Sequence, residues 1–379
     1  MNRKEFEALV QQVTERLTEF LETELRKIRS ELESAIESLK EMLEEGTSPA
    51  EPVEPDQPID PEEPEEPVEP EEPVEPEPEE PVEPIAPTGW RFGAYVPDLP
   101  SGRTDLPAFE ECVGGSMQIA SAFTDWTYVL GGDNDLWMAD GGKRKILYSW
   151  EPFGIRFADV TAGRQDAYLK RVADSMKVFP YDIYVRPWGE MNANWSTWQP
   201  TADGGKPDGG TPAEFIAAWR YLCSYFWKAN VKNLKFVFDP DASDHPNNTR
   251  IPTIWPGVDY VDVLGIDGYN WGVNPATGDT WRRFDEIFKH MYAILTDLHP
   301  TAPVWICETA CSEPSINDGA PVDTAHSKAE WVDHMWDVLD GGVFPRVTEL
   351  AWFNVRKERD WRIESSDDTV EVVNARLQT

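Results

Sequence analysis

Two glutamates of this sequence stand in settings that suit acid–base and nucleophilic chemistry. Glu190 lies in the segment RPWGEMNANWSTWQP, which joins one arginine, one carboxylate and three tryptophans directly after an apolar run. Glu308 closes a second apolar run, VWICE. Two carboxyl groups about 5–5.5 Å apart can cleave a glycosidic bond with retention, one as acid and base and the other as nucleophile. Clustered indole rings suit sugar rings, so the two segments together indicate a glycan-directed cleft.

This chemistry needs a scaffold that brings distant segments together, and residues 89–379 predict one. Eight short β-like runs occur there, and helical patterns separate several of them. The runs cover residues 90–96, 117–123, 145–150, 182–188, 234–239, 261–269, 302–308 and 348–355. Strands that are apolar on both faces and alternate with helices imply a parallel sheet. Eight such units predict a (β/α)8 TIM barrel. A doubly wound open sheet is the alternative, but no glycine-rich phosphate loop follows the first run.

In a (β/α)8 barrel the catalytic groups project from the carboxyl ends of the strands. Arg186 and Glu190 belong to the end of the fourth run, and Glu308 belongs to the end of the seventh. Strands four and seven lie across the mouth of a closed eight-stranded barrel, so their terminal side chains can converge. A single glutamate at a strand end is ordinarily a partnered rim carboxylate. The pair, on these two strands and with aromatic flanks, favours catalysis.

Four segments of the sequence resemble motifs of a known family. RPWGEMNANWSTWQP resembles the strand-four acid/base motif of glycoside hydrolase family 26, the β-mannanase family of retaining (β/α)8 glycosidases. Three further segments, GRQDAYLKRVAD, GIDGYNW and ICETA, resemble the family's strand-three-to-four helix, strand-six tyrosine segment and strand-seven nucleophile segment. The resemblance covers roughly residues 90–355, with the motifs in the family's order.

The resemblance implies roles for individual residues. Glu190 would be the acid/base and Glu308 the nucleophile. Arg186 would support the carboxylates from inside the barrel, and Tyr269 would hydrogen-bond the nucleophile. Apolar walls around the sugar at the scissile bond would be formed by Trp150, Trp195 and Trp352.

Two more tryptophans, Trp198 and Trp271, are candidates for substrate binding by their position alone, with packing at the rim as the alternative. One residue departs from the family pattern, because Gly189 stands where the family usually has histidine. The missing polar side chain leaves the identity of the sugar open, while both glutamates are retained. β-Mannan or glucomannan is the first expectation, and mixed-linkage β-glucan, xylan and microbial wall polysaccharide remain alternatives.

Residues 1–46 predict one long amphipathic helix of the coiled-coil type. Apolar residues recur in steps of three and four, with one stutter. They are Phe6, Val10, Val13, Leu17, Leu21, Leu25, Ile28, Leu32, Ala35, Leu39 and Met42. Such a stripe needs a partner, so we expect self-association, as a dimer or a trimer. Residues 47–88 contain sixteen Asp or Glu, no Lys or Arg, and frequent proline, which predicts an extended polyproline-II-like linker.

Composition excludes several other functions. The net charge of −36 argues against nucleic acid and anionic membranes as partners, and no apolar run is long enough to span a membrane. No cofactor is expected, and no metal, because the loop DPDASDH lacks the glycine and terminal glutamate of an EF-hand. The four cysteines show no metal-ligand pairing, so we expect free thiols and folding in a reducing cytoplasm.

Two functional classes remain after these exclusions. The first is a retaining endo-β-glycanase with a polysaccharide substrate. The second is a barrel that binds a glycan without cleaving it. The glycine at position 189 favours this second class. The N-terminus shows no apolar segment of the secretory type, and the helix and linker would display the barrel multivalently. An extracellular or virion-associated protein is therefore expected, such as a phage tail-associated depolymerase, with a secreted enzyme as the alternative.

Overall fold

The computed structural model describes residues 89–243, 245–317 and 320–378. The predicted N-terminal helix (1–46) and acidic linker (47–88) lie outside the described residues. The described chain begins just before the first strand and ends in a helix.

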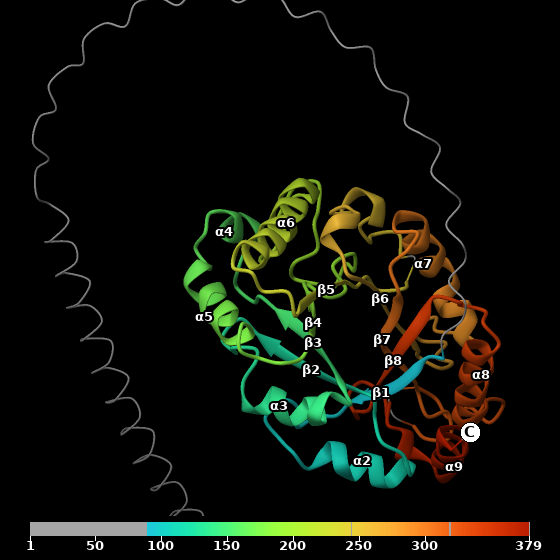
Figure 1. Cartoon of the computed structure of the whole chain (residues 1–379). Coiled ribbons are helices and arrows are strands. Elements are labelled where there is room, and N and C mark those ends of the chain that lie inside the picture. The colour runs from blue at the N-terminus through green and yellow to red at the C-terminus, as the bar shows by residue number, and fades with distance from the viewer. Residues whose placement is uncertain (1–88, 244, 318–319, 379) are drawn as a thin grey trace, which may run out of the picture. The chain divides into compact units, whose positions relative to one another are not determined.

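Eight parallel strands close into a barrel in the order of the sequence, from β1 beside β2 round to β8 beside β1 (Figure 1). The strands are β1 Arg91–Tyr95, β2 Ile119–Asp125, β3 Lys145–Glu151, β4 Ile183–Pro187, β5 Leu234–Phe238, β6 Val263–Asn270, β7 Val304–Cys311 and β8 Val347–Phe353. Each of the eight predicted runs contains or overlaps the corresponding strand. The predicted (β/α)8 barrel is therefore confirmed, and the open sheet is not formed.

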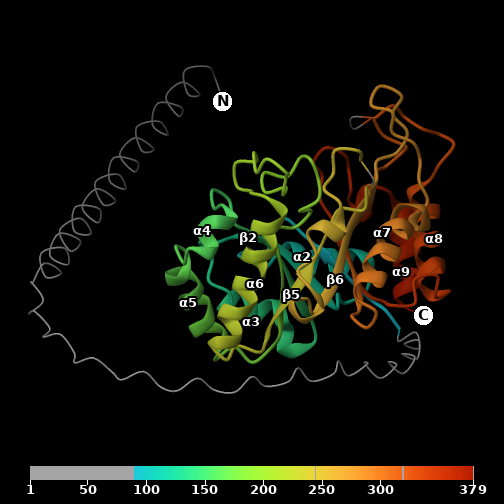
Figure 2. The same cartoon turned by 90° about the horizontal axis from the view of Figure 1, so that it is seen from above.

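Helices surround the strands on the outside of the barrel, as Figures 1 and 2 show from two directions. The α-helices are α2 Asp105–Val113, α3 Asp133–Ala139, α4 Phe157–Thr161, α5 Asp166–Met176, α6 Pro212–Lys228, α7 Phe284–Leu298, α8 Lys328–Asp340 and α9 Asp367–Leu377. In the described part of the chain, four short 3-10 helices lie between them: η1 Asp140–Gly142, η2 Ile251–Thr253, η3 Val258–Tyr260 and η4 Ile363–Ser365. Among the described residues, no helix combines the length and the apolarity needed to cross a membrane.

Helix α6 illustrates how the sequence sets these elements. Thr211 caps the first turn: its hydroxyl accepts a hydrogen bond from the Glu214 amide, and the Glu214 carboxyl accepts one from the Thr211 amide at 2.7 Å. Pro212 occupies the first turn, where no amide hydrogen is needed. Apolar residues then recur every three or four positions and are buried against the barrel. They are Phe215, Ala218, Trp219, Leu222, Cys223 and Phe226.

Side-chain alternation divides the core into two parts. A small cluster inside the barrel contains Ile119, Leu147, Val237, Val263, Trp305, Cys307 and Ala351. A larger cluster fills the layer between strands and helices. Successive residues of a strand point to opposite faces, so in β3 Leu147 and Ser149 point into the barrel while Tyr148 and Trp150 point to the helices. This alternation decides which strand-end residues reach the mouth of the barrel.

Candidate active site

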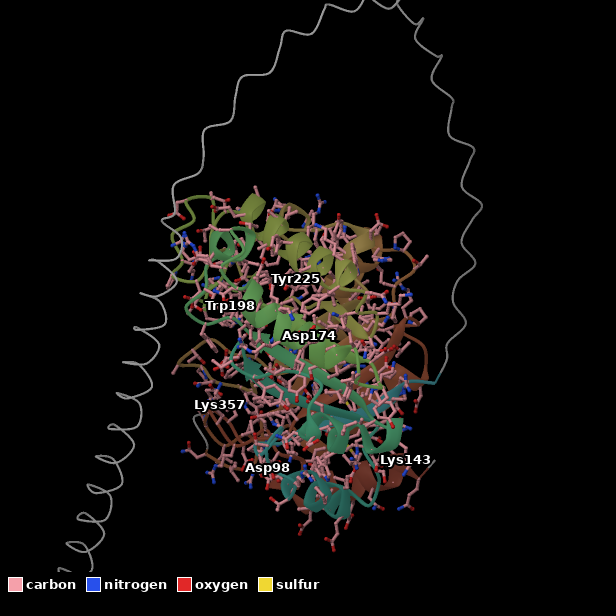
Figure 3. All side chains as sticks on the ribbon, turned by 60° about the vertical axis from the view of Figure 1, so that its left-hand side comes forward. Asp98, Lys143, Asp174, Trp198, Tyr225 and Lys357 are labelled. Carbon is pink, nitrogen blue, oxygen red and sulfur yellow. The ribbon has the colours of Figure 1, made fainter. Side chains whose placement is uncertain are left out.

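A cavity of about 1140 Å³ opens at the carboxyl ends of the strands. Trp198 and Lys357, which line it, lie on the same side of the barrel in Figure 3, away from Lys143 at the amino ends of the strands. Of the nine predicted site residues, six line the cavity. These six are Glu190, Trp195, Trp198, Tyr269, Trp271 and Glu308. Arg186 lies directly beneath them, fully buried.

Arg186 is the cation that binds the carboxyl groups at the floor of the cavity. Its Nη1 donates to Asp239 Oδ2 at 2.7 Å and to Asp267 Oδ2 at 2.6 Å, and its Nη2 donates to a Glu308 carboxyl oxygen. Strand register explains the convergence, because Asp267 of β6 pairs with Glu308 of β7. Three carboxyl groups therefore share one guanidinium. Burial raises the pKa of both Asp239 and Asp267, and the nearby guanidinium opposes that rise.

The second partner of Glu308 is Tyr269, whose hydroxyl donates to the other carboxyl oxygen. Burial first, and then the neighbouring Glu308 charge, raise the pKa of Tyr269 well above its usual value. The phenol therefore stays protonated and remains a donor at neutral pH. Arg186 and Tyr269 together hold both oxygens of Glu308 in a fixed orientation, as the resemblance implied.

Glu190 is presented by an unusual piece of backbone after β4. Trp188 and Glu190 adopt positive φ angles of 56° and 53°, a left-handed conformation that costs about 1–3 kcal/mol each and persists only where surrounding contacts enforce it. The Glu190 amide donates to the Asp239 carbonyl at 2.9 Å. Trp188 is fully buried against Phe157 and Phe215. These contacts hold the turn and aim the Glu190 side chain into the cavity.

The Glu190 carboxyl is tuned toward its protonated form. Burial, followed by the charges of Asp241 and Glu308, raises the pKa of Glu190 to about 8. A hydrogen bond from Trp195 Nε1 at 2.7 Å acts in the opposite direction, because it stabilises the ionised carboxylate. A glutamic acid that keeps its proton near neutral pH, opposite a glutamate that is bound to an arginine, has the properties of a general acid.

The loop after β5 forms another part of the surroundings of Glu190. The Asp241 amide donates to Asn192 Oδ1 at 2.8 Å, and Asn192 Nδ2 donates to the Asp241 carbonyl at 2.9 Å, so the loops after β4 and β5 are tied together. The Asp241 carboxyl accepts hydrogen bonds from the Ser243 amide and hydroxyl. Burial nevertheless raises the pKa of Asp241 to about 6.

Aromatic side chains form two walls of the cavity. On one side Trp195 is 54% exposed, and Trp198 packs against Phe153 with ring centroids 5.2 Å apart. On the other side Trp271 is 39% exposed and meets Trp361 edge to face at 5.0 Å. Wide, partly exposed indole surfaces of this kind suit the flat faces of sugar rings.

Trp150 and Trp352 do not lie where we expected them. Both were expected in the sugar-facing walls, but both are fully buried in the layer between strands and helices. Trp150 Nε1 donates to the Tyr168 hydroxyl, and Trp352 Nε1 donates to the Trp361 carbonyl, each at 2.9 Å. The reason is the alternation of strand side chains: the neighbours of these two tryptophans line the cavity instead, namely Ser149 and Phe353.

One group of potential metal ligands lies in the described part of the chain, at Asp239, Asp267 and Cys307. The three ligand atoms lie within 4.8 Å of one another. Arg186 already donates to both of the carboxylates, so a guanidinium supplies the positive charge there. In the loop DPDASDH, Asp241 binds Ser243, and His245 Nδ1 accepts from the Asn247 amide; Asp244 lies outside the described residues.

Sequence inspection missed several residues that line the cavity. Glu151 ends β3 and Asp241 follows β5; strand-end position points to both in the sequence, but neither is among the nine predicted site residues. Tyr95 and Phe123 lie in ordinary apolar runs, so nothing distinguishes them from core residues. Trp361 lies in the loop between β8 and α9, eight residues after the strand ends, where no strand-end argument reaches it.

A (β/α)8 barrel with two glutamates, an arginine and a tyrosine at its carboxyl mouth is the arrangement of a glycoside hydrolase. The family model described as glycosyl hydrolase family 26 matches residues 160–306. The chain belongs to glycoside hydrolase family 26. The predicted family is thus confirmed.

Individual relatives agree with this assignment. Endoglucanase H of Acetivibrio thermocellus is 31% identical over 284 residues, which are 75% of this chain and 30% of that protein. Mannan endo-1,4-beta-mannosidase A and B of Caldalkalibacillus mannanilyticus is 34% identical over 91 residues, 23% of this chain and 16% of that protein. The chain therefore spans less than a third of the length of either relative.

Among solved structures, the catalytic domain of the GH26 endo-beta-1,4-mannanase of Bacillus sp. JAMB-750 has the same fold. The TM-score is 0.55 at 15% sequence identity, with 77% of this chain and 86% of that chain covered. At this identity the likeness supports the fold alone.

Proposed function

We propose that the protein is a retaining endo-β-1,4-glycanase that hydrolyses a polysaccharide by double displacement. The observation that carries the proposal is the contrast between the two cavity glutamates. Partial burial and the charges of Asp241 and Glu308 raise the pKa of Glu190 to about 8, whereas Glu308 accepts hydrogen bonds from a guanidinium and a phenol. Different surroundings for two carboxyl groups assign one as acid and the other as nucleophile.

In this mechanism Glu190 protonates the glycosidic oxygen while a Glu308 oxygen attacks the anomeric carbon. The leaving sugar departs with the proton, and a glycosyl ester of Glu308 forms. Glu190, now ionised, then removes a proton from water, and the resulting hydroxide displaces Glu308. Arg186 and Tyr269 hold Glu308 ready for attack in the first step and receive its returning charge in the second.

The proposed substrate is a β-1,4-linked glucan or mannan. The similarity to proteins named as an endoglucanase and as mannan endo-1,4-beta-mannosidases supports both sugars. The open cavity of about 1140 Å³ with aromatic walls on two sides supports binding of several sugar units of one chain. The sequence suggested mannan first, and the longer match to the protein named Endoglucanase H supports glucan as a second proposed substrate.

The test is release of reducing sugar from a panel of glycans. Wild type, Glu308→Ala and Glu190→Ala are incubated with mannan, glucomannan, mixed-linkage glucan, cellulose derivatives and xylan. Release by wild type and its loss in both variants is expected, and proton NMR of the first product should show retention of the β configuration. Glu111→Ala is the control variant. Glu111 is exposed on the outer surface, so its substitution does not alter the cavity.

The second candidate is a barrel that binds a glycan without cleaving it. The observation that favours it is Gly189, which lines the cavity and presents no side chain beside the acid. No release from any glycan, together with equal affinity of wild type and Glu308→Ala for one glycan, would support this function and contradict hydrolysis.

For residues 1–46 we propose self-association, because their apolar stripe follows coiled-coil spacing. With the acidic linker, this would display several barrels on one assembly, as suits a virion-associated or extracellular protein. Light scattering of the full chain and of a variant starting at residue 89 tests the proposal. A monomeric full chain would contradict it.

A further inference from the structure

A second cavity, of about 630 Å³, lies at the amino ends of the strands, at the opposite end of the barrel from the cleft. Figure 3 labels Lys143, just before β3, at this end. Gly89, the first described residue, lines this cavity, so the chain enters the barrel beside it. Neither the sequence motifs nor the proposed mechanism uses the cavity.

Charged side chains surround this cavity because successive residues of a strand point to opposite faces. Leu147 of β3 and Val237 of β5 belong to the core cluster inside the barrel, so Lys145 and Lys235, two positions earlier, also point inward. Three cations and two carboxyl groups line the cavity: Arg91, Lys145, Lys235, Asp262 and Glu349. This local excess of positive charge contrasts with the net charge of −36 of the whole chain.

One of the three cations, Lys235, has no ion-pair partner. The buried carboxyl of Glu349 accepts hydrogen bonds from both Arg91 and Lys145. The charge of Lys235 opposes the rise in pKa that burial causes at Asp262, but no ion pair or hydrogen bond joins its ammonium group to another residue in the described part of the chain. The partly exposed ammonium group of Lys235 is therefore available to a further carboxylate.

The cavity also has an aromatic wall. The rings of Tyr184 and Trp305 lie 4.3 Å apart between centroids, and strand register places Tyr184 beside Lys235. Trp305 Nε1 is buried and has no hydrogen-bond partner among the described residues, although buried N–H groups ordinarily have an acceptor. The wall therefore combines an aromatic surface, an unused donor and an unpaired cation.

The segment that precedes Gly89 has complementary chemistry. Residues 79–88, EEPVEPIAPT, lie outside the described residues and contain three glutamates, three prolines and no lysine or arginine. Proline-rich segments bind to aromatic-lined grooves, and carboxylates pair with lysine and arginine. Ten residues span at most about 30 Å at about 3.1 Å per residue, so the whole segment is within reach of the cavity. Covalent attachment keeps its effective concentration in the millimolar range.

We propose that residues 79–88 bind in the cavity at the amino ends of the strands, with prolines against Tyr184 and glutamates beside Lys235 and Arg91. The spacer predicted for residues 47–88 then ends about ten residues earlier, near residue 78. The catalytic cleft lies at the other end of the barrel, so binding of this segment leaves the access of a substrate to Glu190 unchanged. The inference does not depend on hydrolysis.

The test is disulfide formation in the full chain, with the exposed thiol removed by Cys112→Ser. Ile85→Cys is combined with Thr348→Cys, because Thr348 is an uncharged residue of the cavity wall. The matched control combines Ile85→Cys with Thr301→Cys, since Thr301 is exposed just before β7 and lies outside the cavity lining. The reactivity of each single cysteine toward glutathione disulfide normalises the rates. We expect the intramolecular disulfide to Thr348→Cys to form about tenfold faster than the one to Thr301→Cys.

Charge substitutions then test the basis of the binding. Lys235→Gln, or Glu79→Gln, Glu80→Gln and Glu83→Gln together, should slow the reaction with Thr348→Cys by about three- to tenfold, the effect of losing one to three partly exposed ion pairs. The matched control changes three linker glutamates with the same spacing, in Glu62→Gln, Glu63→Gln and Glu66→Gln, and should leave the rate unchanged.

Two outcomes overturn the inference. Equal normalised rates for Thr348→Cys and Thr301→Cys would show that residues 79–88 have no preference for the cavity. A faster reaction with Thr348→Cys that persists in full after Lys235→Gln and after loss of the three nearby glutamates would show that the complementary charges do not hold the segment there.

Discussion

The indole Nε1 of Trp195 donates a hydrogen bond to the Glu190 carboxyl at 2.7 Å, so one exposed aromatic of the cleft directly contacts the proposed acid. The same tryptophan serves two physical purposes. Its ring offers apolar surface to a sugar, and its N–H stabilises the ionised form of Glu190, which keeps the pKa of Glu190 from rising further above about 8.

Replacing Trp195 by phenylalanine should therefore move the pH profile upward. Without the donor, the ionised Glu190 carboxylate is less stable, and the pKa of Glu190 rises. The alkaline limb of kcat/KM, where the acid loses its proton, should shift to higher pH by about 0.5–1 unit, the effect of one hydrogen bond. Rates on an oligosaccharide measured from pH 5 to pH 10 check this. A shift to lower pH would contradict the assignment of Glu190 as the acid.

Asp241→Asn should move the same limb in the opposite direction. The Asp241 charge raises the pKa of Glu190, so an uncharged side chain of the same shape should lower it and bring the alkaline limb to lower pH by about one unit. Asp174→Asn is the control, since Asp174 pairs with Lys170 on the outer surface of α5 and is labelled in Figure 3. Opposite shifts from Trp195→Phe and Asp241→Asn would locate the titrating acid between these two residues.

Trp150→Ala should act on stability and leave substrate binding unchanged. Trp150 is fully buried between strands and helices, against Trp126 and Tyr168. Loss of a buried indole lowers the free energy of unfolding by about 3–5 kcal/mol, which urea unfolding monitored by fluorescence measures. KM of the folded fraction should match wild type. An increased KM at unchanged stability would contradict this prediction and would support the position in the cleft wall that the family resemblance implied for Trp150.

Arg186→Met should destabilise the protein strongly at neutral pH, because it leaves buried carboxyl groups without their shared cation. Removal of one partner of a buried ion pair costs about 3–5 kcal/mol. Denaturant unfolding at pH 7 provides the measurement, and Arg144→Met, which removes a less buried guanidinium paired with Glu110, is the matched control.

The pH dependence of this variant has a defined sign. Burial already raises the pKa of Asp239 and Asp267 in the folded state, and loss of Arg186 should raise it further. The folded protein then binds more protons than the unfolded chain between the unfolded and the folded pKa. Stability therefore falls as pH rises through that window. Arg186→Met should regain stability on acidification relative to wild type, and a constant difference from pH 4 to pH 8 would be evidence against the charge explanation.

The barrel could be predicted from the sequence because its strands are apolar on both faces and its helices are amphipathic. Strand four was found from its apolar run and strand seven from VWICE, and both lie as expected. Glu190 and Glu308 could be selected as a pair, because their apolar runs are the fourth and the seventh, whose ends face each other across the mouth of a closed barrel, and because aromatic residues flank them. The convergence of Asp267 and Glu308 on Arg186 depends on the register of β6 against β7, which pairs Asp267 with Glu308 and includes an irregularity between Ile266 and Asp267.

The errors share one physical origin. At the end of a strand, a shift of one residue exchanges the cavity for the helix layer, and tryptophan is compatible with both. The sequence does not show whether Trp150 or its neighbour Ser149 faces the cavity, or whether Trp352 or Phe353 does, because a buried tryptophan and a sugar-facing tryptophan have the same chemistry. Trp361 depends on the path of a loop, which hydrophobic periodicity does not describe.

The hydrogen bond from Trp198 Nε1 to the Gly189 carbonyl, 2.9 Å long, has a consequence for how this barrel can diversify. The loop after β4 contains the acid and also two aromatic side chains of the cleft, and it is fastened to the peptide that precedes the acid. An exchange of this loop for one with a different sugar preference would displace the proton donor as well. New specificities are therefore more accessible through a loop that carries no catalytic residue, such as the loop after β3, which contributes Phe153 to the cavity.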